Sequence, residues 1–332
     1  MNVTARSPGL RAVVLSLAFA GCSSAAPEAP APSGGEADPC AGAAGPCTAF
    51  DANRDDETAI QEALITASPG HRFVFGAGTF AFRNTLIVGQ PDVTLRGAGR
   101  DRTVLDFKGQ ESGSEGIFAT ADGFTAEDLT VQETVGDGIK VKGAQRAIFR
   151  RLRVSWRSDT PENHGAYGLY PVQCAGVLVE DSEVEGASDA GIYVGQSKTI
   201  VVRRNRVFGN VAGIEVENSF DADVYGNTAE GNTAGILVFD LPDLEQKNGA
   251  RVRVFDNTVR GNNFRNFGKP GTTLAQLPAG TGIVVLASTD VEITGNAVEE
   301  NNTMSVVVGS YLLLQRPYAD TSFYPFSRRV AV

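Results

Sequence analysis

Residues 191–236, GIYVGQSKTIVVRRNRVFGNVAGIEVENSFDADVYGNTAEGNTAGI, decide the fold of this 332-residue chain. Gly-Ile pairs begin at Gly191, Gly213 and Gly235, so the pattern recurs at equal intervals. Between these pairs, apolar residues alternate with polar ones over short runs such as Gly-Ile-Glu-Val-Glu. Alternation of this kind is the period of β-strands. The stretch therefore predicts a repeat built from short strands.

A second position accompanies each Gly at a fixed distance. Asn205 follows Gly191 and Asn227 follows Gly213 at the same separation, each inside an apolar-x-x-Asn-x-apolar pattern. The same separation recurs outside this stretch, and it is longer only in a sixth copy, where Gly235 precedes Asn257. A spacing held in five copies indicates a true repeat with insertions. The other three pairs are Gly138 and Leu152, Gly168 and Ser182, and Gly282 and Asn296.

A repeat of roughly 22 residues is too short for paired helices and fits a coil of three short strands. A leucine-rich horseshoe is a poor alternative, because its Leu-x-x-Leu-x-Leu frame is missing. Asn at the corner tolerates the left-handed conformation of a tight turn, and stacked Asn side chains can hydrogen-bond along the column. The sequence therefore predicts an all-β, right-handed, single-stranded parallel β-helix. A short helix over 58–67 is expected to cap its first coil.

The N-terminal segment predicts export. Residues 1–21 combine Arg6 and Arg11 with a short apolar run, which is typical of a signal peptide and too short to span a membrane. The run ends in Phe-Ala-Gly-Cys22, which resembles the lipobox of bacterial lipoproteins and implies lipidation of Cys22. Ser23 after the Cys favours the outer membrane, facing the periplasm or the cell surface. An ordinary secretory signal cut nearby is the alternative.

Three segments follow from these patterns: a signal peptide (1–21), a tether (22–48) and the β-helix domain (49–332). The tether is rich in Ala, Pro and Ser, which favours a semi-extended linker. Cys40 and Cys47 close a short loop in an oxidising compartment and are predicted to form a disulfide. Cys174 lies in an apolar run and is expected to be a buried, inert thiol.

Charge and motifs exclude several function classes. There are 29 Lys and Arg against 39 Asp and Glu, and the net charge of −10 argues against a nucleic-acid partner. No zinc spacing, phosphate-binding glycine loop or Gly-x-Ser-x-Gly turn occurs in the sequence. No cofactor is therefore predicted, and Ca²⁺ has no supporting motif.

Candidate site residues follow from the register of the predicted coils. Residues two places after each Gly form one outward column, whose consecutive members lie about 4.8 Å apart. Asp189 lies at the edge of this column, and His164 lies in the polar loop DTPENHGAYG facing it. Cross-strand aromatic packing is the structural alternative for the tyrosines, and simple solvation is the alternative for His164. The column comprises Lys140, Tyr170, Tyr193, Glu215 and Leu237.

Two insertions leave the same corner of the predicted coils. They cover about 155–165 and 263–279, four coils apart, and a third loop near 240–250 leaves another corner. Function concentrates on loops carried by a rigid scaffold. We expect the first two loops to wall the two ends of the face that carries the candidate column.

Charged residues beside the corner alternate in sign from coil to coil. Arg150, Glu180 and Arg203 occupy one such column, and Arg151, Asp181 and Arg204 occupy the next. Neighbours in these columns sit one strand apart, where opposite charges attract. We therefore interpret the two Arg clusters as parts of salt ladders and not as a polyanion site.

Longer strings resemble a known family. AIQEALITASPG, ENHGAYGLYPVQ, GASDAGIYVGQS and GILVFDLP are similar to secreted bacterial lipoproteins with tandem right-handed β-helix repeats, within the pectate-lyase-like superfamily. The resemblance covers about residue 52 to the C-terminus, and His164 departs from its pattern. It implies a protein that binds, cleaves or epimerises a polysaccharide, or a non-catalytic module or scaffold for a secreted haem protein.

The two chemistries that this resemblance allows assign the candidate residues differently. In a lyase or epimerase, Lys140 or His164 would be the base or the cation, and Tyr170 or Tyr193 the acid. A hydrolase would instead need two carboxylates, for which Asp189 and Glu215 are the well-placed pair.

Overall fold

The computed structural model describes residues 38–158 and 160–332. The predicted signal peptide, Cys22 and most of the predicted tether lie outside the described residues. Within the described residues, no helix has the length and apolar character needed to cross a membrane.

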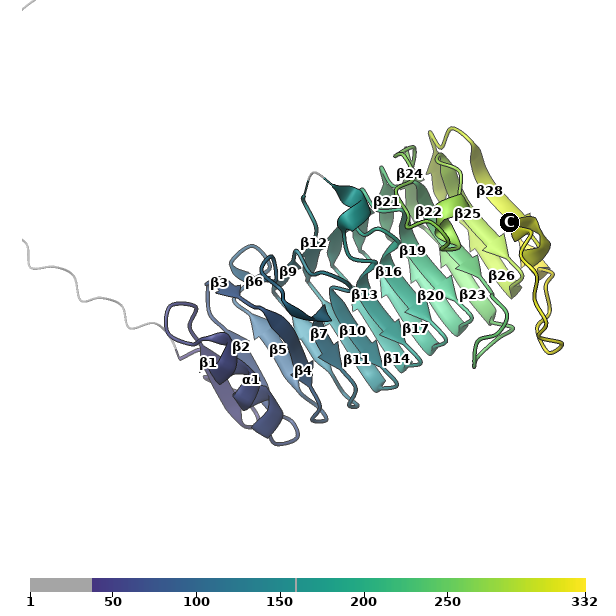
Figure 1. The fold of residues 1–332 in the computed structure, drawn as a ribbon. Helices are drawn as coiled ribbons and strands as arrows, with labels where there is room; N and C mark the ends of the chain where they lie inside the picture. Colours follow the sequence, from purple (N-terminus) through teal and green to yellow (C-terminus); the bar gives the residue numbers. More distant parts are fainter. Residues whose placement is uncertain (1–37, 159) are drawn as a thin grey trace, which may run out of the picture. The chain divides into compact units, whose positions relative to one another are not determined.

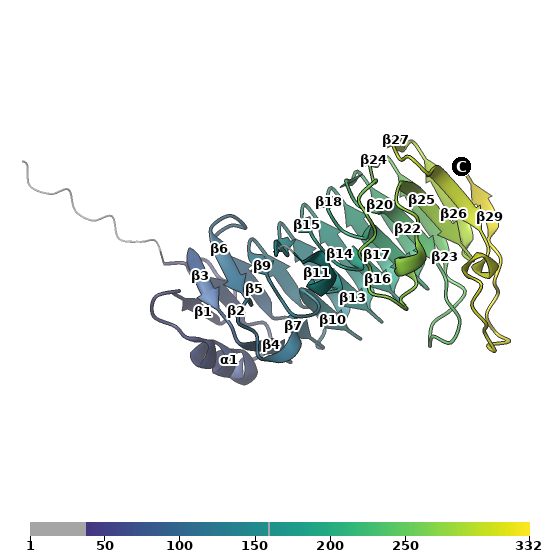
Figure 2. The same ribbon diagram turned by 45° about the horizontal axis from the view of Figure 1, so that its top comes forward.

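The described chain winds into stacked coils that build three parallel sheets (Figures 1 and 2). Most coils contribute one strand to each sheet, and neighbouring strands run parallel, as between β13, β16 and β19. Sheet A contains β1 (Cys47–Phe50), β2 (Arg72–Phe75), β5 (Thr94–Gly97), β8 (Thr125–Glu127), β11 (Gln145–Arg150), β14 (Ala175–Glu180), β17 (Lys198–Arg203), β20 (Phe220–Tyr225), β23 (Ala250–Phe255), β26 (Thr289–Thr294) and β29 (Arg328–Ala331).

The other two sheets are built in the same way, and the predicted parallel β-helix is confirmed. Sheet B contains β3 (Gly78–Ala81), β6 (Thr103–Asp106), β9 (Thr130–Gln132), β12 (Arg153–Ser155), β15 (Glu183–Glu185), β18 (Arg206–Phe208), β21 (Thr228–Glu230), β24 (Thr258–Arg260) and β27 (Ala297–Glu299). Sheet C contains β4 (Asn84–Val88), β7 (Ser112–Ala119), β10 (Ile139–Lys142), β13 (Tyr167–Val172), β16 (Ala190–Gly195), β19 (Ala212–Glu217), β22 (Ala234–Phe239), β25 (Thr281–Leu286) and β28 (Met304–Gly309).

The core consists of inward-pointing aliphatic side chains stacked coil upon coil. The residue after each Gly of the repeat supplies one such column, and all its members are fully buried because both the sheet and the neighbouring coils cover them. This column contains Ile139, Leu169, Ile192, Ile214, Ile236 and Ile283.

The corner Asn residues form two ladders of side-chain hydrogen bonds. In the first ladder, the Asn205 amide donates to Asn227 Oδ1 at 3.0 Å, and Asn227 donates to Asn257 Oδ1 at 2.9 Å. Asn210, Asn232, Asn262 and Asn301 repeat the arrangement at another corner. These buried amides satisfy backbone groups that the turns leave without strand partners.

Helix α1 (Glu57–Thr66) caps the first coils at nearly the predicted position. Asp56 accepts a hydrogen bond from the Ala59 amide at 2.9 Å, as an N-cap should. Ile60 and Leu64 are buried in the main core, and the helix packs against β4. Three single-turn 3₁₀ helices lie in later loops: η1 (Pro161–Asn163), η2 (Leu274–Gln276) and η3 (Tyr311–Leu314).

The predicted disulfide between Cys40 and Cys47 is present, and Cys174 is buried as expected. The first strand, β1, begins at Cys47, which lies inside the segment that we predicted to be tether. The disulfide therefore fastens residues 40–47 to the edge of sheet A.

The salt ladders are also observed. Glu180 accepts from Arg150 Nε at 2.6 Å, and Arg203 and Arg204 of the next coil reach its other oxygen at 2.7 and 2.9 Å. Arg204 also pairs with Asp181 at 2.7 Å. The Arg clusters are thus neutralised by carboxylates on neighbouring strands, as the register predicted.

Candidate functional site

The predicted column lies on the outer face of sheet C. Lys140 pairs in register with Tyr170 between β10 and β13, and Tyr193 pairs with Glu215 between β16 and β19. Glu215 in turn pairs with Leu237 on β22. The repeat therefore brings side chains from five successive coils into one strip.

Three tyrosines pack together at the centre of this strip. The ring centroid of Tyr167 lies 4.6 Å from that of Tyr170 and 4.6 Å from that of Tyr193. The centroids of Tyr170 and Tyr193 are 4.9 Å apart. Tyr193 bends over Gly195, where a Cβ atom would collide with its ring and hydroxyl. Tyr193 is only 5% exposed, so the strip is less open than the sequence suggested.

Two glutamates of β19 form the polar end of the strip. Glu215 and Glu217 alternate with Val216 in an extended strand, so both side chains point outward. Their exposed fractions are only 2% and 8%, and Glu215 Oε2 has no hydrogen-bond partner among the described residues. Glu217 is a site residue that was not predicted, although the alternation in Gly-Ile-Glu-Val-Glu places it on the same face as Glu215.

Burial and mutual repulsion raise the pKa of these carboxyl groups. Burial and the charges of Asp189 and Glu217 raise the pKa of Glu215 well above its ordinary value. Burial also raises the pKa of Glu217 to about 7, although interactions with Glu215 and Tyr193 lower this pKa. Burial and the charge of Glu217 raise the pKa of Asp189 to about 7, although Tyr167 donates to it. All three carboxyl groups therefore hold a proton to a higher pH than an exposed carboxyl group does.

A fourth carboxyl, Asp240, follows β22 at the end of the same face. It is 1% exposed, its Oδ2 atom has no partner among the described residues, and burial raises its pKa to about 7. The charge of Glu217 contributes to this shift. Asp240 therefore extends the acidic cluster by one coil.

Lys140 lies at the opposite end of the strip and is already paired. Its Nζ atom lies 3.2 Å from Glu115 and 3.3 Å from Asp137, and it sits 4.8 Å from the centroid of the Tyr170 ring. Burial raises the pKa of Asp137 despite this pairing. Lys140 is thus held by two carboxylates, which leaves it poorly placed to act as a free base.

His164 does not join the cluster. Its side chain is 5% exposed, and Nδ1 lies 2.6 Å from the Gly186 carbonyl. Nε2 lies 2.8 Å from the Ser158 hydroxyl, so both ring nitrogens have partners. The expectation of a loop histidine facing the strip was wrong, because the loop folds inward and uses the ring to hold its own backbone.

The two long loops meet instead of standing at opposite ends of the face. Glu162 of the first loop pairs with Arg265 of the second at 2.6 Å, and the rings of His164 and Phe267 are 6.5 Å apart. Phe267 and Leu274 belong to one apolar cluster with Tyr193 and other side chains of sheet C. The second loop therefore lies over the outer face of sheet C (Figure 2). This cover explains why the side chains of that face are more buried than the repeat alone predicts.

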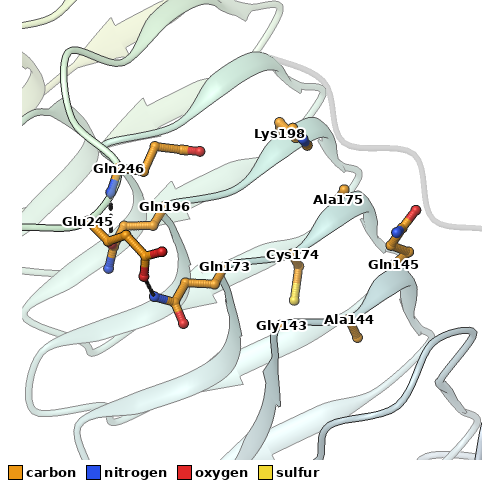
Figure 3. A pocket seen from close by; sticks show the side chains of 10 residues that line it. All are labelled: Gly143, Ala144, Gln145, Gln173, Cys174, Ala175, Gln196, Lys198, Glu245 and Gln246. Carbon is orange, nitrogen blue, oxygen red and sulfur yellow. Dashed lines mark hydrogen bonds between the residues drawn. The ribbon is translucent and has the colours of Figure 1, made fainter.

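A polar cavity of about 570 Å³ opens beside the strip, at the corner between sheets C and A (Figure 3). Its lining includes Gln145, Gln173, Gln196, Lys198 and Glu245. Gln173 and Gln196 follow β13 and β16 directly, so the strands that carry Tyr170 and Tyr193 lead into it.

The chemistry available on this face is proton transfer. Burial raises the pKa of all three carboxyl groups, and those of Asp189 and Glu217 to about 7, so this face holds groups that can donate or accept a proton near neutral pH. The three tyrosines stay protonated, since burial raises the pKa of each one. In the described part of the chain, no group of three or more His, Cys, Asp or Glu side chains is arranged to hold a metal ion.

Comparisons with known proteins agree with the fold. Residues 100–298 match the family model described as "Right handed beta helix region". The structure is similar to the A-module of mannuronan C-5 epimerase AlgE4 of Azotobacter vinelandii, with a TM-score of 0.57 and 17% identity over 83% of each chain. The AlgE6 A-module of the same organism gives 0.56 and 17%, over 83% of this chain and 81% of that one. No curated protein matches the sequence.

Proposed function

The chain belongs to the family of right-handed β-helix proteins, and from that premise we propose that it binds and processes a polysaccharide on the outer face of sheet C. The observation that carries this proposal is the pair of buried carboxyl groups of Glu215 and Glu217, with half-buried Asp189, beside three tyrosines. Burying carboxyl groups side by side costs stability, and perturbed carboxyl groups gathered on one face mark a candidate functional site.

The trio favours hydrolysis of a glycosidic bond over elimination. In this reaction Glu215 donates its proton to the departing glycosidic oxygen, and ionised Glu217 or Asp189 takes a proton from the attacking water. The Tyr193 ring bends over Gly195, the register partner of Glu217, and in this proposal its hydroxyl positions that carboxylate. Elimination or epimerisation would need a free base and a cation for the sugar carboxylate, and Lys140 is held by Glu115 and Asp137.

Turnover of glycans by matched variants tests the proposal. The full-length protein would be incubated with neutral and acidic polysaccharides, and the products would be analysed by mass spectrometry. Glu215→Gln should abolish product formation, whereas Glu299→Gln, which changes an exposed carboxylate on sheet B, should leave it intact. Binding without products would support a binding module. The absence of both binding and products would contradict the proposal and would favour the scaffold role that the family resemblance implies.

We further propose that the protein is an outer-membrane lipoprotein anchored through Cys22. The support is the sequence pattern before that residue, which lies outside the described residues. Metabolic labelling with a radioactive fatty acid should mark the wild type and not Cys22→Ser. Equal labelling of both would contradict the anchor, and recovery of the labelled protein with the inner membrane would contradict the location.

A further inference from the structure

We infer that the glycan taken by this face is uncharged, and that its chain runs from the tyrosines of sheet C into the glutamine-lined cavity at the corner between sheets C and A. The inference rests on the proposed function and adds the substrate class and a second subsite. It follows from the charges on the face, from a buried carboxyl without a partner, and from the lining of the cavity.

The charges on the face disfavour an acidic polymer. Glu215 and Glu217 lie on β19, Asp189 precedes β16 of the neighbouring coil, and the cation at the other end of the strip, Lys140, is already paired with two carboxylates. Each sugar of a polyuronate would bring a further negative charge toward this cluster. Repulsion between like charges several ångströms apart, at low effective dielectric, weakens binding by about tenfold or more.

One oxygen of the Glu215 carboxyl group lacks a hydrogen-bond donor. Its Oε2 atom is buried and has no hydrogen-bond partner among the described residues, which is costly for a polar atom. A sugar hydroxyl can donate to this oxygen without adding charge. The hydroxyl groups of a uronate can donate as well, but its carboxylate also brings a negative charge close to Glu215 and Glu217.

The corner cavity supplies uncharged polar groups in line with the tyrosines. Gln173 and Gln196 come shortly after Tyr170 and Tyr193 in the sequence, about 10 Å further along an extended strand. Gln173 donates to Glu245 at 3.1 Å, and the backbone amide of Gln246 donates to Gln196 at 3.2 Å, which fixes both side chains on one side of the cavity (Figure 3).

The opposite side of the cavity is free to bind. Gln145 and Lys198 are exposed there. The backbone amide of Gln145 donates to Asp122, but within the described residues the Gln145 side chain has no hydrogen bond. Amides both donate and accept, which matches sugar hydroxyls, and the charges of Lys198 and Glu245 offset each other. A polyhydroxylated, uncharged chain fits this lining, and a volume of about 570 Å³ is enough for sugar rings.

Titration calorimetry with defined oligosaccharides tests the inference on the full-length protein. The probes are hexamers of glucose, mannose and N-acetylglucosamine, and hexamers of galacturonate and mannuronate. At least one neutral hexamer should bind about tenfold more tightly than either uronate hexamer. Equal or tighter binding of a uronate hexamer would overturn the substrate class and leave the proposed function standing. Absence of binding by all probes would contradict the proposed function itself.

A paired variant tests the second subsite. Gln145→Ala should weaken binding of the preferred hexamer by about fivefold to tenfold, the effect of one lost hydrogen bond, and should leave its trimer unaffected. Gln132→Ala on sheet B is the matched control and should change neither. Unchanged hexamer binding by Gln145→Ala, or an equal loss for trimer and hexamer, would show that the chain does not run into the cavity.

Discussion

Tyr193 and Glu215 stand one full coil apart in the sequence and are direct neighbours in the fold, paired in register between β16 and β19. The Tyr193 ring also bends over Gly195, which is the register partner of Glu217, the next outward residue of β19. One turn of the solenoid thus brings an aromatic ring and two carboxyl groups together.

Gly195→Ala should disturb the site without touching a carboxyl group. A Cβ atom at this position collides with the ring and hydroxyl of Tyr193, which must swing away from Glu217. Because the Tyr193 ring is buried and packed against Tyr167 and Tyr170, moving it should lower the free energy of unfolding by about 1–3 kcal/mol. Glycan turnover should fall at least as far as in Tyr193→Phe. Turnover equal to that of the wild type would show that the hydroxyl does not position Glu217.

The melting temperature should be higher at pH 5.5 than at pH 8. Burial raises the pKa of Asp189, Glu217 and Asp240 to about 7, whereas the unfolded values lie near 4. The folded state therefore binds more protons between pH 4 and 7, and the stability from this cluster is lost as the pH rises through that window. Summed over the cluster, calorimetry should show a difference of roughly 5 °C or more.

Glu217→Gln should flatten this pH dependence, because the amide does not ionise. Asp223→Asn, which changes a partly exposed carboxylate of sheet A, is the control and should keep the wild-type dependence. A wild-type melting temperature that rises between pH 5.5 and 8 would contradict the raised pKa values.

Asn227→Ala should break the first Asn ladder. Its side chain accepts from the Asn205 amide and donates to the Val202 carbonyl and to Asn257, all at 2.9–3.0 Å and all buried. Leaving these groups without partners should lower the free energy of unfolding by about 3 kcal/mol in denaturant titrations. Asn302→Ala, at an exposed position, should cost less than about 0.5 kcal/mol. Equal costs for the two would refute a stabilising ladder.

Glu180→Ala should destabilise far more than removal of a more exposed ladder carboxylate. Burial raises the pKa of Glu180, but hydrogen bonds from Arg203 and Arg150 outweigh it, and the net pKa lies below the ordinary value. The contribution of Glu180 to the free energy of unfolding is therefore present above about pH 5 and is lost as the pH falls. We expect a loss of about 2 kcal/mol at pH 7, against about 0.5 kcal/mol for Asp223→Ala. A smaller loss for Glu180 would contradict the ladder's contribution.

The fold could be predicted from the sequence because each coil repeats the same short pattern of glycine, apolar and corner residues. The spacing from Gly213 to Asn227 sets strand and corner together, and a constant spacing fixes the register of all later coils. The register in turn placed Lys140, Tyr170, Tyr193 and Glu215 in one column, as observed.

The cover over the site could not be predicted in the same way. Loop 263–279 is an insertion, so the repeat does not say whether it stands up or lies down, and its apolar Phe267 and Leu274 were the available signal. His164 was misplaced for the same reason, because its loop folds inward to Gly186. Glu217 was missed because one residue per coil was assigned to the face, although alternate residues of a strand share it.

Carboxyl titration by carbon NMR tests the central claim most directly. Glutamate labelled with carbon-13 at the side-chain carboxyl would be followed from pH 4 to 9 in the wild type, Glu215→Gln and Glu217→Gln, so that both resonances are assigned. We predict that Glu217 titrates near pH 7, that the pKa of Glu215 lies well above its ordinary value, and that Glu217→Gln lowers the pKa of Glu215 by removing a neighbouring charge. Titration of both groups between pH 4 and 5, with no mutual dependence, would show that no proton-holding cluster exists on this face.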